Sequence, residues 1–133
     1  MKSLFVLAAT LIAFLVFAAF TALQTGYQVG EKVMDFSLKN VDGKTVSLST
    51  NKSAKGLILV FTCNTCPVAQ AYEQRVMDLD KQFASKGYPV IAINANDAAL
   101  SPGDNFQAMK KRSADRKYSF HYLTDETQQI AKT

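Results

Sequence analysis

The only two cysteines of this 133-residue chain, Cys63 and Cys66, are separated by Asn64 and Thr65. Two thiols at this spacing can form a reversible disulfide, which is the chemistry of thiol-disulfide exchange. The apolar run Leu57–Phe61 precedes the pair, and a helical pattern follows it. A thiolate at the start of a helix faces unpaired N–H groups and the positive end of the helix dipole, so its pKa falls below the free value of about 8.5. The position therefore predicts reactive cysteines.

Two other uses of a cysteine pair fit less well. A disulfide across two intervening residues closes a short loop and stabilises a fold by only about 2 kcal/mol, compared with roughly 4 to 5 kcal/mol for a long loop. A zinc site needs four ligands, and Cys63, Cys66 and the single histidine, His121, supply three. A partly buried, hydrogen-bonded His121 is the favoured interpretation. We therefore predict no metal and no cofactor.

The flanking patterns predict the elements that position the cysteines. Val33–Leu38 and Thr45–Leu48 alternate on either side of Asp42-Gly43, which predicts a β-hairpin with a type I′ turn. Leu57–Phe61 and Pro89–Ile93 are typical of strands buried on both faces. Between these two strands, apolar residues recur at helical spacing, which predicts an amphipathic helix that ends at Gly87. These apolar residues are Val68, Tyr72, Val76, Leu79 and Phe83.

A strand, a helix and a second strand in this order form a βαβ unit with adjacent parallel strands and a right-handed connection. The cysteines are then expected at the carboxyl end of a central strand, where open α/β sheets place their sites. Further on, the pattern predicts a mostly exposed helix over residues 105–116 and a short strand at Phe120–Leu123. A last helix is expected to start at Glu126, capped by Thr124 or Asp125.

The N-terminal segment predicts export. Lys2 precedes the apolar stretch Leu4–Leu23, which matches the basic and apolar regions of a signal peptide. A stretch of this length can also remain as a membrane anchor. We interpret residues 1–23 as a signal peptide or signal anchor and residues 24–133 as the folded domain. Either outcome predicts a periplasmic or secreted location, with possible anchoring through residues 4–23.

The chain carries a formal net charge of +4, with a local excess of basic residues around residues 110–117. A solvated helix face is the favoured interpretation of this cluster. Asp115 interrupts the run, and no aromatic side chains alternate with the charges as they do in single-strand binders. We therefore predict no nucleic-acid partner.

Several segments together resemble a known family. Asp35–Leu38 and Asp42–Lys44, within Gly30–Leu48, followed by Leu59–Pro67, resemble the redoxin branch of the thioredoxin superfamily, which includes the alkyl hydroperoxide reductase/thiol-specific antioxidant proteins. The similarity covers the chain from Gly30 to its end. It implies an α/β thioredoxin-like fold in which an N-terminal hairpin joins a βαβ unit with central parallel strands.

The resemblance also implies roles for residues in and around the cysteine pair. Cys63 would be the nucleophile and Cys66 the resolving thiol of a redox-active disulfide, with support from Thr62, Asn64, Thr65 and Pro67. The expected activity is that of a thiol-disulfide oxidoreductase. Its partners would be protein or small-molecule thiols and disulfides, with an upstream protein as electron donor.

Two alternatives from the same branch remain open. Peroxidatic relatives resemble Pro-x-x-x-Thr-x-x-Cys, but Val60 precedes Cys63 by three residues and Cys63 itself precedes Cys66 by three. A peroxidase is therefore the less favoured alternative. Copper-binding relatives use Cys-x-x-x-Cys and a distant histidine; the spacing here is one residue shorter, and His121 comes before the expected ligand region. Close relatives often carry a histidine where this chain has Thr65. Without that cation beside Cys63, the pair is predicted to be less oxidising than the pair of those relatives.

The prolines suggest that part of the domain is missing. The resemblance implies a cis-proline loop after the third strand, opposite the cysteines. The prolines of this chain are Pro67, Pro89 and Pro102, and none follows Phe120–Leu123. We therefore expect a C-terminally truncated sequence that lacks the closing hairpin.

Overall fold

The computed structural model describes residues 26–132. Residues 32–132 form one compact unit, and Gly26–Glu31 belong to a second unit, in which they form a hydrogen-bonded turn. The predicted leader, residues 1–23, lies outside the described residues. Within the described range, no helix is both long and apolar enough to cross a membrane.

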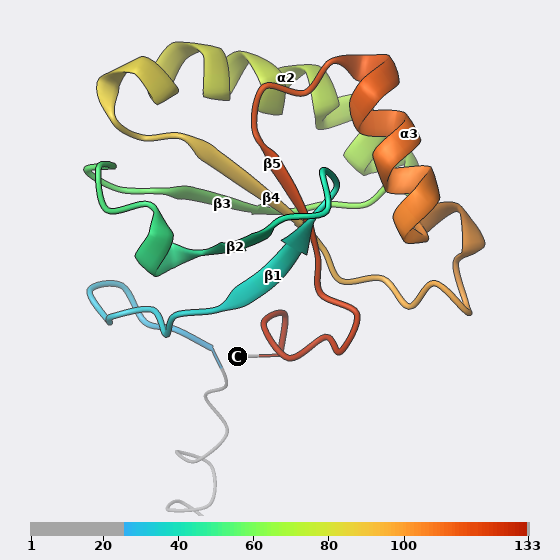
Figure 1. Cartoon of the computed structure of the whole chain (residues 1–133), viewed down its shortest axis with the longest axis horizontal. Helices are drawn as coiled ribbons and strands as arrows, with labels where there is room; N and C mark the ends of the chain where they lie inside the picture. Colours follow the sequence, from blue (N-terminus) through green and yellow to red (C-terminus); the bar gives the residue numbers. More distant parts are fainter. Residues whose placement is uncertain (1–25, 133) are drawn as a thin grey trace, which may run out of the picture. The chain divides into compact units, whose positions relative to one another are not determined.

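The unit 32–132 is built on one five-stranded mixed sheet in the order β2-β1-β5-β4-β3 (Figure 1). β3, β4 and β5 are parallel to one another, whereas β1 runs antiparallel to both β2 and β5. The strands are β1 (Ser37–Asn40), β2 (Thr45–Ser47), β3 (Ile58–Phe61), β4 (Val90–Asn94) and β5 (His121–Thr124), and the helices are α2 (Pro67–Phe83) and α3 (Phe106–Arg116). The predicted α/β fold with a hairpin and a βαβ unit is confirmed.

The hairpin forms between β1 and β2, but its turn differs from the prediction. Gly43 has a positive φ of 87°, whereas Asp42 does not. The N–H of Asn40 donates to the carbonyl of Lys44 at 2.8 Å, which closes a three-residue loop over residues 41–43. A type I′ turn needs positive φ at both central residues, so the predicted turn type is wrong. β1 also begins later than expected, at Ser37.

The βαβ unit consists of β3, α2 and β4, but β3 is not a central strand. Among the described residues it pairs only with β4, in a register that aligns Phe61 with Ile93. β5 pairs with β4 on one side and with β1 on the other, which places β3 at the edge of the sheet. Burial follows this order, because every residue of β4 is buried and none of β3 is fully buried. The expectation of a central strand before the cysteines is therefore wrong for this sheet.

Side chains of alternate strand residues form two cores, one on each face of the sheet. One face buries Ile91, Ile93 and Leu123 against residues of the N-terminal hairpin region. On the other face, Ala92 and Tyr122 pack against Met109 of α3. This alternation is the normal consequence of the two-residue period of a strand.

The apolar face of α2 is buried only along part of its length. Val76, Leu79 and Phe83 are half-buried, whereas Val68 and Tyr72 are 65% and 53% exposed. The predicted packing of the first two turns is therefore wrong. The fully buried residues of α2 are instead two acids, Glu73 and Asp80.

The last predicted element, a helix from Glu126, is also wrong, since residues 126–132 form turns. The carboxylate of Asp125 accepts hydrogen bonds from the N–H groups of Ile130 and Ala131 at 3.0 and 3.1 Å. Gln128 has a φ of 59°, in the left-handed region. A side chain that binds these N–H groups and a left-handed residue both interrupt helical geometry.

Candidate functional site

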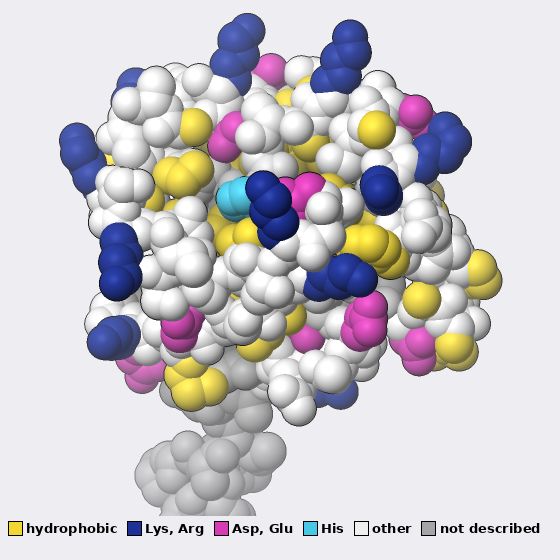
Figure 2. Space-filling view, in the orientation of Figure 1, with side chains coloured by type: hydrophobic (Ala, Val, Ile, Leu, Met, Phe, Trp, Pro, Cys, Tyr) yellow, Lys and Arg dark blue, Asp and Glu magenta, His cyan; other side chains and the backbone are white. Residues whose placement is uncertain are grey.

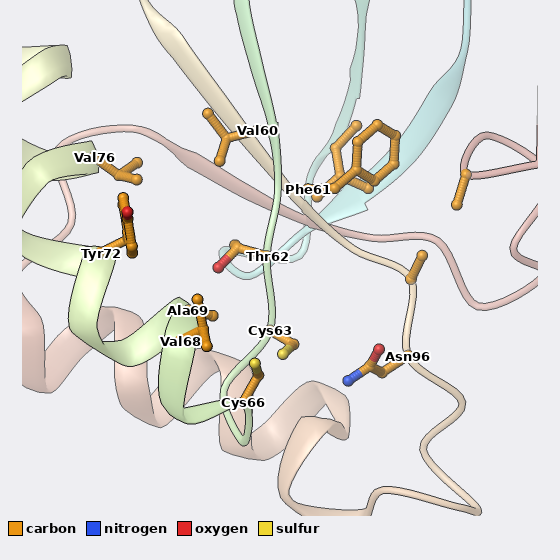
Figure 3. A pocket seen from close by; sticks show the side chains of 13 residues that line it. Val60, Phe61, Thr62, Cys63, Cys66, Val68, Ala69, Tyr72, Val76 and Asn96 are labelled. Atoms are coloured by element: carbon orange, nitrogen blue, oxygen red, sulfur yellow. The ribbon is translucent and has the colours of Figure 1, made fainter. Parts of the chain in front are cut away.

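The cysteine pair lies at the carboxyl edge of the sheet, between the end of β3 and the start of α2 (Figure 3). Cys63 and Cys66 are free thiols, both half-buried, and their sulfur atoms point toward each other. Pro67 occupies the first turn of α2, where the missing N–H of proline removes no helical hydrogen bond. The N–H of Thr62 donates to the carbonyl of Ile93 at 2.9 Å and extends the pairing of β3 with β4 up to the site.

Cys66 is the N-cap residue of α2 and lies in the electrostatic field of the helix start. Its side chain forms no capping hydrogen bond of full geometry, yet the N–H groups of Ala69 and Val68 are near enough to lower the pKa of the thiol. Burial opposes this effect, the Cys63 thiol adds to it, and the negative charge of Asp104 opposes it. The net pKa of Cys66 lies below its ordinary value, so the predicted effect of the helix start is found at this cysteine.

Asn64, between the two cysteines, is anchored through both its backbone and its side chain. It is 6% exposed. Its N–H donates to Asp104 Oδ1 at 2.5 Å, its Nδ2 donates to the carbonyl of Gly103 at 2.9 Å, and its Oδ1 accepts from the Tyr122 hydroxyl at 3.0 Å. The link between the thiols is therefore held by residues roughly 40 and 60 positions away in the sequence.

Asp104 is the last residue of the short 3-10 helix η3 (Pro102–Asp104). It also binds Thr65, the second residue between the cysteines. It is 3% exposed, and its Oδ2 accepts from the hydroxyls of Thr65 and Ser101, each at 2.6 Å. Two side-chain amides at the end of β4 complete the shell, since Asn94 donates to Oδ1 at 3.0 Å and Asn96 donates to Oδ2 at 2.9 Å. Five donors thus surround one carboxylate.

This shell keeps Asp104 ionised. Burial raises the pKa of the carboxyl, but hydrogen bonds from the side chains of Ser101, Thr65 and Asn96 and from the Asn64 backbone outweigh burial. The net pKa lies well below its ordinary value. A buried negative charge is therefore present beside the cysteine pair throughout the physiological pH range.

A second buried carboxylate, Glu73, holds α3 against α2 behind the site. It forms ion pairs with Arg112 at 2.8 Å and Arg116 at 2.7 Å and accepts a hydrogen bond from the Tyr118 hydroxyl. Arg112 also donates to the carbonyl of Asn64 at 3.3 Å. The cluster therefore connects α3 to the loop between the cysteines.

These contacts change the interpretation of the basic cluster. The solvated face predicted for residues 110–117 holds for Lys111, whose ion pair with Asp115 is exposed. Arg112 and Arg116 instead neutralise the buried carboxylate of Glu73. On the face drawn in Figure 2, Lys and Arg side chains are dispersed and do not gather in one patch.

An open apolar cavity of about 730 Å³ borders the cysteine pair. The end of β3 and the first turns of α2 line it, and Figure 3 shows both thiols at its rim. Its apolar wall includes the exposed side chains of Phe61, Val68 and Tyr72. An apolar surface therefore lies directly beside the two thiols.

His121 does not join this site. It is exposed at the first residue of β5 and is aligned with Ile91, two residues before the position that pairs with Phe61. The partly buried position expected for His121 is therefore wrong. In the described range, no cluster of three or more His, Cys, Asp or Glu side chains has the geometry to hold a metal ion.

Sequence reasoning missed the residues that hold the link between the cysteines. The sequence patterns give Ser101 and Asp104 no predicted element, and they place Tyr122 in the predicted strand Phe120–Leu123 with no connection to the site. One signal was present in the sequence, because Asn94 and Asn96 are polar residues directly at the end of the buried run Pro89–Ile93. Polar side chains at this edge of a parallel sheet commonly belong to a site.

Comparison with known proteins places the chain in a family. Residues 29–133 match the model of the AhpC/TSA family. The chain belongs to the AhpC/TSA family. Its fold is thioredoxin-like, as in the exposed lipoprotein thioredoxin of Streptococcus pneumoniae, which is 23% identical, with a TM-score of 0.58 over 73% of this chain and 70% of that one.

Two relatives are more similar in sequence. An uncharacterised conserved protein from Geobacillus kaustophilus is 37% identical, with a TM-score of 0.76 over 80% of this chain and 57% of that one. The thiol-disulfide oxidoreductase ResA of Halalkalibacterium halodurans is 27% identical over 74 residues, which are 56% of this chain and 42% of ResA. The matched part of the chain thus spans less than two thirds of either relative.

Proposed function

We propose that this chain is an extracytoplasmic thiol-disulfide oxidoreductase that uses Cys63 and Cys66. The observation that carries the proposal is the pair of facing free thiols at the start of α2, where helix N–H groups lower the pKa of Cys66. A thiolate is the nucleophile of disulfide exchange, so this position favours the reaction at neutral pH. The similarity to ResA, which is named for this activity, supports the same assignment.

In the proposed reaction the Cys63 thiolate attacks one sulfur of a partner disulfide. The partner S–S bond breaks, one partner thiolate leaves, and a mixed disulfide forms at Cys63. The Cys66 thiolate then attacks the Cys63 sulfur, releases the second partner thiolate and leaves a Cys63–Cys66 disulfide. The partner gains two electrons, and a donor protein must return two electrons to the chain. The lowered pKa of Cys66 suits the second step, because more of this thiol is ionised at neutral pH.

Trapping of mixed disulfides tests the proposal and the order of the two cysteines. Cys66→Ser should accumulate mixed disulfides through Cys63, and Cys63→Ser should accumulate none, when intact cells are quenched with acid and analysed on non-reducing gels. If only Cys63→Ser traps partners, the roles are reversed and Cys66 attacks first. If neither variant traps a partner, the oxidoreductase proposal is wrong.

The same cells test the proposed location. A membrane-impermeant maleimide should label the reduced cysteines of the wild-type chain without lysis, and the Cys63→Ser/Cys66→Ser double variant should remain unlabelled. Labelling that requires lysis would contradict an extracytoplasmic site. The apolar stretch Leu4–Leu23 and the similarity to an exposed lipoprotein thioredoxin support this location.

A further inference from the structure

Asp104 is placed to act on the cysteine pair without contacting a substrate. Its two carboxylate oxygens bind the two residues that separate the thiols, since Oδ1 accepts from the Asn64 N–H at 2.5 Å and Oδ2 accepts from the Thr65 hydroxyl at 2.6 Å. The same carboxylate is fixed to the end of β4 through Asn94 and Asn96. One side chain therefore fastens the loop between the cysteines to the carboxyl end of β4.

We propose that Asp104 is a positioning residue for thiol-disulfide exchange: it holds the Asn64–Thr65 link in one conformation, and its negative charge makes the Cys63–Cys66 pair a weaker oxidant. This inference rests on the proposed function.

The charge argument follows from the position of the carboxylate. Asp104 is hydrogen-bonded to Thr65, the residue directly before Cys66, and it is buried, so little water screens it from the thiol. A nearby negative charge disfavours a thiolate, and its effect on Cys66 has this sign. A less stable thiolate makes the reduced pair less stable, which favours the disulfide and lowers the oxidising power.

The positioning argument leads in the same direction. An Asn64–Thr65 link that is held still keeps the two sulfur atoms facing each other and so favours closure of the disulfide. Both effects predict that the chain without the Asp104 charge is more easily reduced.

Asp104→Asn tests the inference in the full chain. The asparagine keeps the size of the side chain and one accepting oxygen but removes the charge. Equilibrium with mixtures of reduced and oxidised glutathione should shift toward the dithiol by at least about threefold, the size expected for one nearby charge in a partly screened site. Thiolate formation, followed by ultraviolet absorbance, should occur at lower pH than in the wild type.

Asp80→Asn is the matched control. Asp80 is also a buried carboxylate, 4% exposed, and it accepts from the Val90 N–H at 2.9 Å and the Ser119 hydroxyl at 2.6 Å. It lies fourteen residues after Cys66, about 21 Å along the axis of α2. Asp80→Asn should lose stability and keep the wild-type glutathione equilibrium and thiolate titration. If Asp104→Asn changes neither quantity relative to Asp80→Asn, the role of Asp104 is only structural and the inference is wrong.

Ser101→Ala is a milder variant that tests the charge if Asp104→Asn does not fold. It removes one donor from the carboxylate and leaves the charge less neutralised. The thiolate should then form at higher pH, opposite to the effect of Asp104→Asn, and an unchanged titration would overturn the inference. The wild type separates failure of this inference from failure of the proposed function. If mixtures of reduced and oxidised glutathione produce no Cys63–Cys66 disulfide in the wild type, the proposed function itself is wrong.

Discussion

The ion-pair cluster of Glu73 allows a direct test of how burial determines the strength of a charge pair. The Glu73 carboxylate is 8% exposed and binds Arg112, Arg116 and the Tyr118 hydroxyl. Glu73→Gln removes the charge, keeps one accepting oxygen, and leaves two guanidinium groups beside a neutral amide. We expect this variant to lower the free energy of unfolding.

The exposure of the partners sets the size of this loss. Removing one partner of a fully buried ion pair costs about 3 to 5 kcal/mol, because the remaining charge is left buried without compensation. Arg112 and Arg116 are 24% and 48% exposed, so both can regain part of their hydration. The expected loss is therefore about 2 to 3 kcal/mol.

Asp115→Asn is the control on the same helix. The Lys111–Asp115 pair is shorter, at 2.6 Å, but its side chains are 76% and 58% exposed. Exposed pairs at this helical spacing contribute about 0.5 kcal/mol or less. Urea unfolding followed by circular dichroism measures both variants. A loss below about 0.5 kcal/mol for Glu73→Gln, or equal losses for the two variants, would refute the reasoning from burial.

The Glu73 contribution also depends on pH, with a defined sign. Burial raises the pKa of the carboxyl, but hydrogen bonds from Arg112 and Tyr118 and the charges of Arg112 and Arg116 outweigh it, and the net pKa lies below the ordinary value of 4.5. A group whose pKa is lowered by folding stabilises the fold above its unfolded pKa and loses this effect as the pH falls. The stability difference between wild type and Glu73→Gln should therefore be full at neutral pH and shrink as the pH falls below 4.5.

Two further substitutions test the packing around the cysteine loop. At Gly103 an added Cβ would lie 2.7 Å from Thr65 Cγ2, so Gly103→Ala should lower the free energy of unfolding by about 1 to 3 kcal/mol. The same variant should change the rate at which Ellman's reagent modifies the reduced cysteines. An unchanged rate would show that the loop adapts without moving the thiols. The buried Tyr122 hydroxyl donates to Asn64 Oδ1 and accepts from Asn94 Nδ2. Tyr122→Phe should therefore lower the free energy of unfolding in urea by about 1 to 2 kcal/mol. An unchanged free energy would mean that Asn64 finds another donor.

Local patterns in the sequence were sufficient to predict the elements next to the cysteines. Alternating residues around Asp42-Gly43 predicted the hairpin, and the runs that precede Cys63 and follow Tyr88 predicted two parallel strands joined by a helix. Each signal depends on residues a few positions apart, because side-chain direction repeats every two residues in a strand and every 3.6 in a helix. The turn type was not predictable in this way, because Asp-Gly also fits a three-residue loop.

Strand order could not be predicted from these patterns. β3 and β4 are both apolar runs, but β5 pairs with β4 and β1, so β3 lies at the edge. The helical spacing of Val68 and Tyr72 likewise predicted that both side chains are buried, but both are exposed. The C-terminal turns also depend on a particular side chain, Asp125, whose bonds to later N–H groups replace a helix.

By itself, the sequence determined that two thiols lie at a strand-to-helix junction, because cysteine spacing, the preceding apolar run and Pro67 are local features. Only the tertiary structure showed what surrounds them. Asp104 reaches Asn64 from 40 residues away, and Arg112 reaches Glu73 from 39. A buried charge is stable only where distant donors converge on it, and such convergence depends on how the whole chain packs.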